Sequence, residues 1–467
     1  MKLWSTAGTR THTARENVRS QEKRERSAVH AGKITEEDTR AGAKNTDQAT
    51  TEDIWDYDWH TNWQEDEHSD HLPHGYVSKA RTKRQTLRTV AITLACLGAL
   101  YLFMIYTNLP FIAKWRTIYI ETAMSTMTHQ WLATAFIPQS VIDKAMNGRY
   151  NLDEQQNGLF SDWADAGGEG PASAPWEEEK ERFFEAYPEI DRESFEAYFD
   201  AHSGEVIDGE GYLVIDKAGL EDGGTTIRTV HGDEVLAIDT RNGIVIVKIK
   251  GDGYVARMAI VKDASRVGVA VAEGIGSVGS TMAELAQHSG AVLAINASGF
   301  YDPDGHGNGG QPYGLVKSNG KLYNKAEPGN YKTIGFDQND RLYIGEYSSA
   351  DDFRDAVEFK PALIINGKKL VSGSAGWGVQ PRSAIGQTED GDVLLLIVDG
   401  RAPGYSIGST LGDCADMLER YGAVQACNLD GGSSSVMYYN GREISRPSAA
   451  NKVNGRRLPD GFVVYEK

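Results

Sequence analysis

The chain has 467 residues, of which 48 are Lys or Arg and 66 are Asp or Glu, so its formal net charge is −18. Its length suits two or three domains. The 40% hydrophobic content is typical of a globular protein and excludes a collagen, a coiled-coil rod and a polytopic membrane protein. The acidic balance argues against a nucleic-acid partner, because binding a polyphosphate requires a basic surface.

The first 88 residues differ from the rest in charge. They hold 15 Lys and Arg and 15 Asp and Glu, so the remaining residues carry the whole net charge. Residues 1–75 are polar and lack apolar periodicity, which predicts a disordered tail. A metal site is the alternative for the histidines of this tail, although their spacing matches no known ligand pattern. These histidines are His60, His68, His71 and His74.

An uncharged stretch follows the tail. Residues 89–113 contain no charged side chain and are long enough to cross a membrane core of about 30 Å. A buried core helix is the alternative. Five Lys or Arg residues at positions 79–88 precede the stretch and two follow it, so the positive-inside rule places residues 1–88 in the cytoplasm. We therefore expect a single-pass protein of the cell membrane whose C-terminal domain is extracytoplasmic.

The next two segments lead to the predicted domain. Residues 114–175 are interpreted as a stalk and linker, which ends in the Gly- and Pro-rich sequence AGGEGPASAP. Residues 176–205 are interpreted as an amphipathic helical segment, broken into two short helices at Pro188. Its aromatic side chains recur at helical spacing and are expected to pack rather than to bind a ligand.

Residues 206–467 have the pattern of a folded domain. Short β-rich runs alternate with Gly, Asn and Asp turns, and two helices are predicted at Ser280–Ser289 and Thr410–Tyr421. Each helix precedes an apolar strand, Ala291–Ile295 and Val424–Leu429. The expected fold class is α+β, with a β-rich mixed-sheet catalytic domain behind a single transmembrane helix.

Three cysteines, Cys96, Cys414 and Cys427, are too few for a disulfide scaffold, and they form no CxxC pair that suggests zinc. Cys414 and Cys427 are compatible with one bridge in an extracytoplasmic domain. Two small buried apolar residues are the favoured interpretation.

Four segments place polar residues directly after a buried strand, where sites are usually built. The first, Ala294–Gly314, begins with Asn296 and continues through a glycine-rich loop. Oxygen ligands at every second position resemble the start of a calcium loop, but the bidentate Glu at the twelfth position is missing. A calcium site, a substrate-facing loop and an ordinary polar turn all remain open. The alternating residues are Asp302, Asp304, His306 and Asn308.

The second and third segments bring arginines to strand ends. Arg382 begins a short apolar run, where a guanidinium grips a phosphate or forms a structural salt bridge. Asp399 and Arg401 follow the apolar run LLLIV, and such charges are costly at a strand end unless they are paired or used. Ser409 or Thr410 is the expected cap of the following helix.

The fourth segment, Ala426–Gly441, contains Asp430 after a buried strand. Gly431 and Gly432 allow a tight turn, whose backbone N–H groups, with Ser433 and Ser434, form a predicted nest for a phosphate or an oxyanion. The alternative for an isolated DGG sequence is a hairpin turn.

Together the ordered motifs INASGF, PRSAIG, VDGR and NLDGGSSS resemble the phosphodiester glycosidase family over roughly residues 230–467. Family members often have Asn, Gly or Ala, Gly, Tyr and Phe where this chain has Asn296–Phe300, Thr at position 383 and a third Gly at position 433. The resemblance implies hydrolysis of a sugar-1-phosphodiester that releases the sugar and leaves a phosphomonoester.

The resemblance also implies roles for the residues of the four segments. Asp399 and Asp430 supply the carboxylates that stabilise or attack an oxocarbenium-like carbon or activate water, in an order that the sequence leaves open. Arg382 and Arg401 clamp the phosphate, and Gly431–Ser434 donate hydrogen bonds. His306 and Asn296 orient substrate or water. No cofactor is required, and calcium at Asp302, Asp304 and Asn308 remains an option.

The expected substrate is a glycan or sugar-phosphate polymer of the cell envelope or an exopolysaccharide. Two other classes of function remain open. One is a non-catalytic glycan-binding or scaffold protein with the same fold. The other is a metal-dependent phosphodiesterase that cleaves the P–O bond, which is disfavoured because the chain lacks paired His and Asp motifs for two metals.

Overall fold

The structure is a computed structural model that describes residues 76–163, 180–305, 307–448 and 455–467. The chain divides into two units, Met1–Lys79 and Ala80–Lys467, and the second contains nearly all of the described residues. The predicted tail with its four histidines, the AGGEGPASAP linker and His306 lie outside the described residues.

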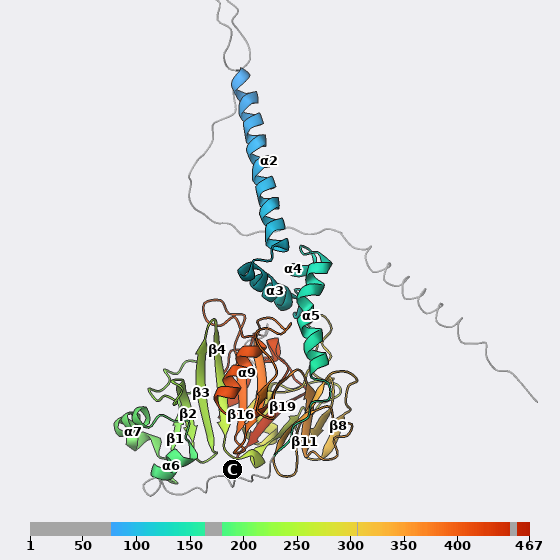
Figure 1. The fold of residues 1–467 in the computed structure, drawn as a ribbon. Helices are drawn as coiled ribbons and strands as arrows, with labels where there is room; N and C mark the ends of the chain where they lie inside the picture. The colour runs from blue at the N-terminus through green and yellow to red at the C-terminus, as the bar shows by residue number, and fades with distance from the viewer. Residues whose placement is uncertain (1–75, 164–179, 306, 449–454) are drawn as a thin grey trace, which may run out of the picture. The chain divides into compact units, whose positions relative to one another are not determined.

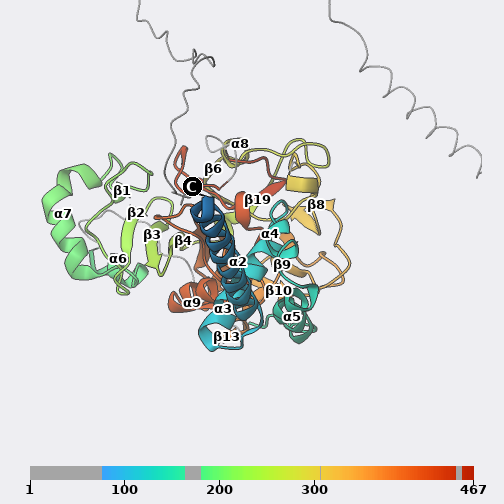
Figure 2. The same cartoon turned by 90° about the horizontal axis from the view of Figure 1, so that it is seen from above.

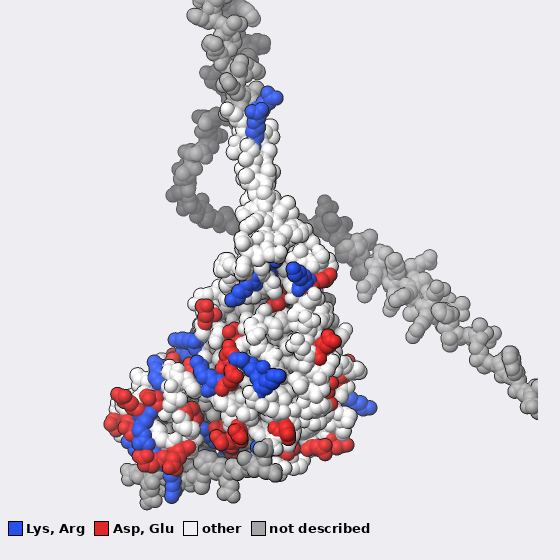
Figure 3. Space-filling view, in the orientation of Figure 1, with Lys and Arg blue, Asp and Glu red and all other residues white. Residues whose placement is uncertain are grey.

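The uncharged stretch forms the end of one long helix. Helix α2 covers Tyr76–Tyr106, and within the described residues Arg84–Tyr106 is the one segment long and apolar enough to cross a membrane, with a mean hydropathy of 2.0. Only 6% of it is buried, which disfavours the alternative of a core helix. Figure 3 shows that the visible face of α2 carries neither acidic nor basic side chains beyond its basic start.

The expected span of 89–113 is corrected at its end. Helix α2 stops at Tyr106, and Leu109 has the non-helical angles φ −58° and ψ 126°. Pro110 then opens helix α3, Pro110–Met124. A proline disfavours the helical conformation in the residue before it and is tolerated in the first turn, so the break falls at this position.

The expected stalk is also corrected, because it packs onto the domain. Helices α4 (Trp131–Thr134) and α5 (Gln139–Gln155) share a small apolar core with α3 that includes Ile120 and Ile142. After α5, the buried Gln156 donates to the carbonyl of Ala362 at 2.8 Å. Ser161 donates to Gln425 at 2.8 Å. These polar side chains complete buried backbone and side-chain hydrogen bonds of the sheet, which a linker does not do.

The two predicted aromatic helices are confirmed as α6 (Lys180–Ala186) and α7 (Arg192–Val206). Asp191 caps α7 by accepting a hydrogen bond from the N–H of Ser194. Phe183 and Phe195 are buried against strand residues of the domain core, so their role is packing. Both views place α6 and α7 beside strands β1 and β2 (Figures 1 and 2).

Three sheets make up the β-rich part. The first has nine strands among the described residues. In spatial order they are β1 (Val214–Asp216), β2 (Glu234–Asp239), β3 (Ile244–Gly251), β4 (Tyr254–Val261), β15 (Val393–Val398), β14 (Arg382–Thr388), β16 (Ala423–Asn428), β12 (Ala362–Ile365) and β13 (Lys368–Lys369).

The other two sheets have five strands each in the described chain. One has the order β10 (Leu342–Gly345), β9 (Lys332–Phe336), β11 (Asp355–Phe359), β7 (Val316–Ser318) and β8 (Lys321–Asn324). The other has the order β18 (Arg442–Glu443), β17 (Met437–Tyr439), β6 (Ala291–Asn296), β19 (Asp460–Tyr465) and β5 (Val267–Val271). Short 3-10 turns occur at η2 (Ala264–Arg266), η3 (Pro303–Gly305) and η4 (Gly432–Ser434).

The fold is α+β and β-rich as expected, but the expectation of a mixed sheet is wrong. Every strand pairing within the three sheets is antiparallel. Strands β15 and β16 are joined through helix α9 (Leu411–Arg420) and lie on either side of β14, which runs against both. Helix α8 (Met282–Ser289) joins β5 and β6 around β19 in the same way. The two strands that each helix connects therefore run parallel to each other, and an antiparallel strand lies between them.

Both crossover helices begin at a capping box, and for α9 the cap is Thr410, one of the two residues expected there. Thr410 forms a capping box with Asp413, and Thr281 forms one with Glu284. The first sheet is buried on both faces. Along β15, alternate side chains enter a core shared with α6, α7 and α9 or a core shared with the other two sheets. This explains the continuous apolar run VLLLIV.

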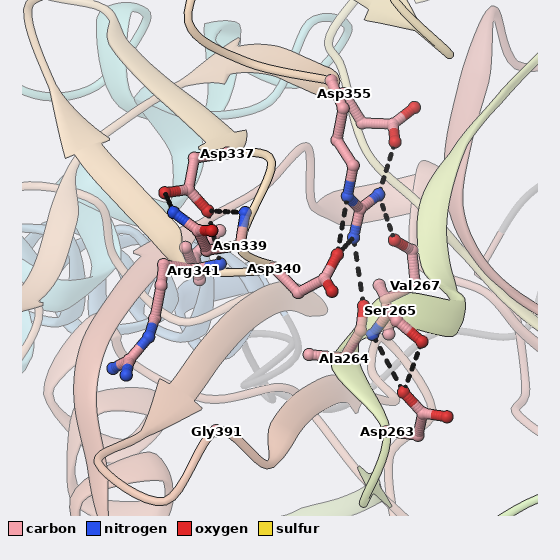
Figure 4. Close-up of polar contacts among 12 residues, drawn as sticks. Asp263, Ala264, Ser265, Val267, Asp337, Asn339, Asp340, Arg341, Asp355 and Gly391 are labelled. Atoms are coloured by element: carbon pink, nitrogen blue, oxygen red, sulfur yellow. Dashed lines mark hydrogen bonds and ion pairs between the residues drawn. The ribbon is translucent and has the colours of Figure 1, made fainter. Parts of the chain in front are cut away.

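Arg354 ties the second sheet to the third. Its guanidinium donates to Asp355 at 2.6 Å and to Asp340 at 2.9 Å, and it also binds the carbonyls of Val267 and Ala264 (Figure 4). One planar guanidinium with several donors can bind acceptors on separate segments, so Arg354 holds the junction of these two sheets.

The cysteines are not bridged in the structure. Cys414 and Cys427 are buried and free, and Cys96 on α2 is exposed and free. The favoured interpretation of two small buried residues is therefore confirmed.

Candidate active site

The ends of β6 and β16 meet where the third sheet joins the first. Asn296, at the end of β6, donates to the carbonyl of Asp430 at 2.5 Å and accepts from Ser383 at 2.7 Å and from the N–H of Val436 at 3.2 Å. The N–H of Asp430 donates to the carbonyl of Ala297 at 3.0 Å. Asn296 is completely buried. Its amide therefore positions Asp430, and the expected contact with substrate or water is not available to it.

Asp430 lies half-buried just beyond β16. The pKa of its carboxyl group is raised to about 6. Burial is the largest cause and the charge of Asp302 adds to it, while Ser434, Arg456 and the N–H of Gly431 act in the opposite direction. A carboxyl group with a pKa near neutrality changes its protonation state in the range where general acid–base catalysis is most effective.

Arg456 is a site residue that the motifs did not indicate. Its Nη2 donates to Asp302 at 2.6 Å and its Nη1 donates to Ser433 at 2.9 Å. The guanidinium carbon lies 4.5 Å from the centre of the Phe300 ring. Arg456 lies two positions after residues 449–454, which are outside the described chain. Its sequence context offers no strand-end pattern that would have revealed it.

Asp460 is the second unexpected acidic residue. It opens β19, is completely buried and accepts from the N–H of Ser298 at 2.8 Å. Its other carboxyl oxygen has no hydrogen-bond partner among the described residues. Burial raises the pKa of Asp460 to about 7, with a contribution from the charge of Asp430. An acidic residue directly before the apolar run GFVVY was the available sequence signal.

The predicted donor nest is largely occupied by the protein itself. The N–H of Gly432, which has φ +65°, donates to the carbonyl of Pro381 at 2.9 Å. The N–H of Ser434 donates to the carbonyl of Gly431 at 3.2 Å. Gly431 and Ser434 also oppose the rise in the pKa of Asp430. The turn therefore holds Asp430 and Arg456 in place, and the expected row of free donors is corrected.

Arg382 lies beneath the site with only 1% of its surface exposed. Its Nη2 donates to the carbonyls of Trp377 and Gly378, each at 2.9 Å, and its Nε donates to that of Ser409 at 3.4 Å. Burial lowers its pKa to about 10. The guanidinium thus fixes the loop before β14, and the expected direct clamp on phosphate is not supported by this geometry.

Arg401 remains available to an anion. It has the left-handed angle φ +58° and its side chain is exposed. Its Nη1 donates to Ser448 at 3.3 Å, and its Nη2 lies next to Gly432, where an added Cβ would be 3.2 Å away. Within the described residues it forms no ion pair. The absence of a side chain at Gly432 therefore leaves room for this guanidinium beside the Asp430 turn.

Asp399 is engaged on both carboxyl oxygens. Oδ2 accepts from Arg257 at 2.6 Å and from the Tyr405 hydroxyl at 2.8 Å, and Oδ1 accepts from the N–H of Arg446 at 2.8 Å. Only 2% of its surface is exposed. A carboxylate held in this way serves as a structural anchor, so the geometry does not favour the catalytic role expected for it.

The loop expected to bind calcium uses its oxygens internally. Asp302 bonds Arg456 and the N–H of Gly307. Asn308 accepts from the N–H of Gly310 at 3.0 Å and donates to Ser277. The side chains of Asp304 and His306 lie outside the described residues. Within the described residues, no group of three acidic, His or Cys side chains is placed to hold a metal ion. Because Asp302 is already paired with the guanidinium of Arg456, the structure does not support a calcium site in this loop.

The site therefore combines a half-buried carboxyl group of raised pKa with two arginines of different availability. Arg456 is oriented by Asp302 and Ser433, and Arg401 is exposed beside the glycine turn. A carboxylate next to guanidinium groups is suited to a substrate that carries both an anionic group and an electrophilic carbon.

Comparison with known proteins gives two curated relatives. A Bacillus subtilis (strain 168) protein, SPbeta prophage-derived uncharacterized protein YomE, is 29% identical over 182 residues, which covers 36% of this chain and 27% of that protein. The N-acetylglucosamine-1-phosphodiester alpha-N-acetylglucosaminidase of Bos taurus is 27% identical over 202 residues, covering 38% of this chain and 37% of the relative. The chain thus spans about a quarter to a third of the length of these relatives.

Among solved structures, the zebrafish N-acetylglucosamine-1-phosphodiester alpha-N-acetylglucosaminidase catalytic domain, auto-inhibited by its pro-peptide, is 21% identical. The match has a TM-score of 0.39 and covers 48% of this chain and 82% of that one. The family model for phosphodiester glycosidases matches residues 289–465, which contain Asn296, Arg382, Asp430 and Arg456. Over this segment, the chain is therefore similar to phosphodiester glycosidases.

Proposed function

We propose that the protein is a hydrolase that cleaves the glycosidic bond of sugar-1-phosphodiesters. In this reaction water adds to the anomeric carbon and the bond between that carbon and the phosphate oxygen breaks. The sugar leaves with a hydroxyl group, and the phosphate leaves as a monoester that retains its original oxygens. The departing phosphate monoester is a stable anion, so the reaction needs little help from a strong general acid.

The observation that carries this proposal is the environment of Asp430. It is the half-buried carboxyl group of the site, and burial raises its pKa to about 6. The Asp302–Arg456–Ser433 chain and Arg401 lie around the same turn. A carboxylate in such a position stabilises or attacks an oxocarbenium-like carbon, while guanidinium groups hold the adjoining phosphate.

We assign roles accordingly. Asp430 acts in its ionised form as the nucleophile or as the base that activates water. Arg401 and Arg456 bind the phosphate. Asn296 positions the backbone of Asp430. Asp460 is completely buried, and the charge of Asp430 contributes to its raised pKa, so the two carboxyl groups interact. Asp399 and Arg382 support the surrounding loops.

We further propose that α2 anchors the protein in the cell membrane as a single-pass helix, with the domain extracytoplasmic. The apolar side chains of α2 are exposed, including Leu94 and Leu97. Large aromatic side chains are also exposed on α3 and α4, including Trp115 and Trp131. Tryptophan is enriched at membrane interfaces, which fits helices that directly follow a span. An anchored hydrolase of this kind fits a substrate in an envelope glycan or exopolysaccharide.

The test is an assay of the full-length, detergent-solubilised protein on a panel of sugar-1-phosphodiesters that differ in sugar and aglycone. We expect release of free sugar together with a phosphomonoester from at least one member. Binding without turnover across the panel would favour a glycan-binding protein. Loss of turnover in a chelator, restored by a divalent metal, would favour a metal-dependent phosphodiesterase.

A further inference from the structure

Helix α5 carries one more guanidinium, which lies outside the segment that matches the family and contacts the loop before β14. The carbon Cζ of Arg149 lies 3.9 Å from the centre of the Trp377 ring, which is a close cation–π contact. Among the described residues Arg149 makes neither a hydrogen bond nor an ion pair. The nearby Asp153 is paired with Lys360 at 3.0 Å instead. Arg149 is thus half-buried, and Asp153, the acidic side chain whose charge acts on it, is shared with Lys360.

Trp377 connects Arg149 to the base of the site. Its ring carries Arg149, and its backbone carbonyl accepts the hydrogen bond from Nη2 of Arg382. Helix α3 holds the same loop, because Thr122 accepts from the N–H of Val379 at 3.0 Å. Two membrane-proximal helices therefore fix the loop that precedes β14.

The loop has the shape needed to receive these helices. Gly376 has φ +80° and Gly378 has φ +63°. A Cβ at Gly376 would lie 2.4 Å from the backbone nitrogen of Arg149, and one at Gly378 would lie 2.5 Å from that of Thr122. Only glycine permits both the left-handed angle and such a close backbone approach. Arg149 is consequently held on a rigid support rather than on a mobile arm.

The charges around Arg149 leave room for an anion. The charges of Arg149 and Arg401 both lower the pKa of Arg382, so each of these two guanidinium groups acts on the buried guanidinium that holds the loop before β14. Arg149 also acts on Tyr331, which in turn is influenced by Asp430. Glu121 of α3 is the acidic residue that acts on Arg382, but burial raises the pKa of Glu121 and weakens it as a counter-ion. Guanidinium groups that are partly buried and not fully neutralised lower the stability of the fold unless an anion binds to them.

We propose that Arg149 is a phosphate-binding residue, so that membrane-proximal helix α5 completes the anion site beside Asp430. This inference rests on the proposed function and extends it to a residue outside the family segment. A guanidinium stacked on an indole ring presents its N–H edge in a fixed plane, which suits two phosphate oxygens.

The experiment measures the binding of inorganic phosphate to the full-length protein in detergent by isothermal titration calorimetry. Arg149→Met removes the charge and keeps a side chain that packs on Trp377. Lys144→Met is the matched control, because Lys144 is an exposed cation on the same helix. We expect Arg149→Met to weaken phosphate binding about 10-fold or more and Lys144→Met to leave it within about twofold.

Arg149→Lys keeps the charge and loses the planar fork, so we expect an intermediate affinity. This variant decides the matter if Arg149→Met does not fold. Phosphate affinity that is unchanged in the folded Arg149 variants, or wild-type protein that binds no phosphate, would overturn the inference. Arg149-dependent phosphate binding in a protein that hydrolyses none of the sugar-1-phosphodiesters would support the inference and reject the proposed hydrolase. Hydrolysis of a sugar-1-phosphodiester together with unchanged phosphate binding in Arg149→Met would support the proposed hydrolase and reject the inference about Arg149.

Discussion

Two strand ends of the same sheet carry an aspartate each, and their surroundings differ. Asp399 follows β15 and is held by Arg257, Tyr405 and the backbone of Arg446. Asp430 follows β16 and is half-buried, with a pKa that burial raises to about 6. The sequence motif places a carboxylate at a strand end in both cases. The number of partners then decides whether that carboxylate anchors the fold or remains available for chemistry.

The largest expected effect concerns Asp430. Asp430→Asn keeps the size of the side chain and removes its charge and basicity, so we expect sugar-1-phosphodiester hydrolysis to fall by a factor on the order of 10³ or more. Circular dichroism should show an intact fold. Near-wild-type turnover in the folded variant would remove Asp430 from the catalytic role and erase the contrast with Asp399.

Asp399→Asn should act on stability instead. Removing one partner of a buried ion pair leaves the charge of Arg257 uncompensated, so we expect a loss of about 3–5 kcal/mol in the free energy of unfolding. Activity per folded molecule should change little. Denaturant titration with activity measured on the folded fraction checks this. A stable Asp399→Asn protein without activity would show that both aspartates belong to the chemistry.

Arg456 and Arg382 offer a similar comparison between a residue proposed to bind substrate and a residue that supports the fold. Arg456→Lys loses the fork that joins Asp302 to Ser433, so we expect kcat/KM to fall about 10–100-fold, equivalent to about 1.4–2.7 kcal/mol. Arg382→Lys should instead lower the melting temperature, because one ammonium group cannot replace bonds to three carbonyls. If Arg382→Lys left the melting temperature unchanged and abolished activity, Arg382 would be restored as the phosphate clamp.

The pH dependence follows from the pKa of Asp430. If the ionised carboxylate acts, kcat/KM should rise with pH through about 6 and fall about 10-fold from pH 7 to pH 5. The profile is measured with a substrate whose phosphodiester does not titrate in this range. A fall in kcat/KM as the pH rises through 6 would mean that the protonated form acts as an acid.

The last prediction concerns the pH dependence of stability. Burial raises the folded-state pKa of Asp460 from 3.8 to about 7, so the folded protein binds more protons than the unfolded chain in this window. The resulting stability is present below about pH 4 and is lost as the pH rises to about 7, with a slope of at most about 1.4 kcal/mol per pH unit. Asp460→Asn should flatten this slope in denaturant titrations at pH 4.5, 6 and 8. An unchanged slope would indicate that Asp460 is ionised when folded.

The sequence predicted the elements whose signals are local. The helices α6, α7, α8 and α9 and the strands β6 and β16 follow from caps, periodicity and apolar runs, and residues 206–467 were correctly expected to be β-rich. The contacts of Gln156 and Ser161 with the sheet depend on distant segments and have no local pattern. The stalk was therefore expected where the structure has a docked segment.

The same distinction applies to the site. Asp430 and Arg401 were predicted as site residues because each follows a buried strand. The turn at Gly432, next to both residues, was predicted from its two consecutive glycines. Arg456 and Arg149 were missed because neither follows a strand and their place in the site is set by tertiary contacts alone. Asn296 and Arg382 were also predicted as site residues, but their burial favours supporting roles that residue type does not indicate.

The most direct test of the proposed chemistry is hydrolysis of a sugar-1-phosphodiester in water enriched in ¹⁸O, with both products examined by mass spectrometry. Attack on the anomeric carbon beside Asp430 predicts that the label enters the sugar and that the phosphomonoester stays unlabelled. Label in the phosphate would mean that the P–O bond breaks. That result would contradict the glycosidase assignment and the role given to Asp430.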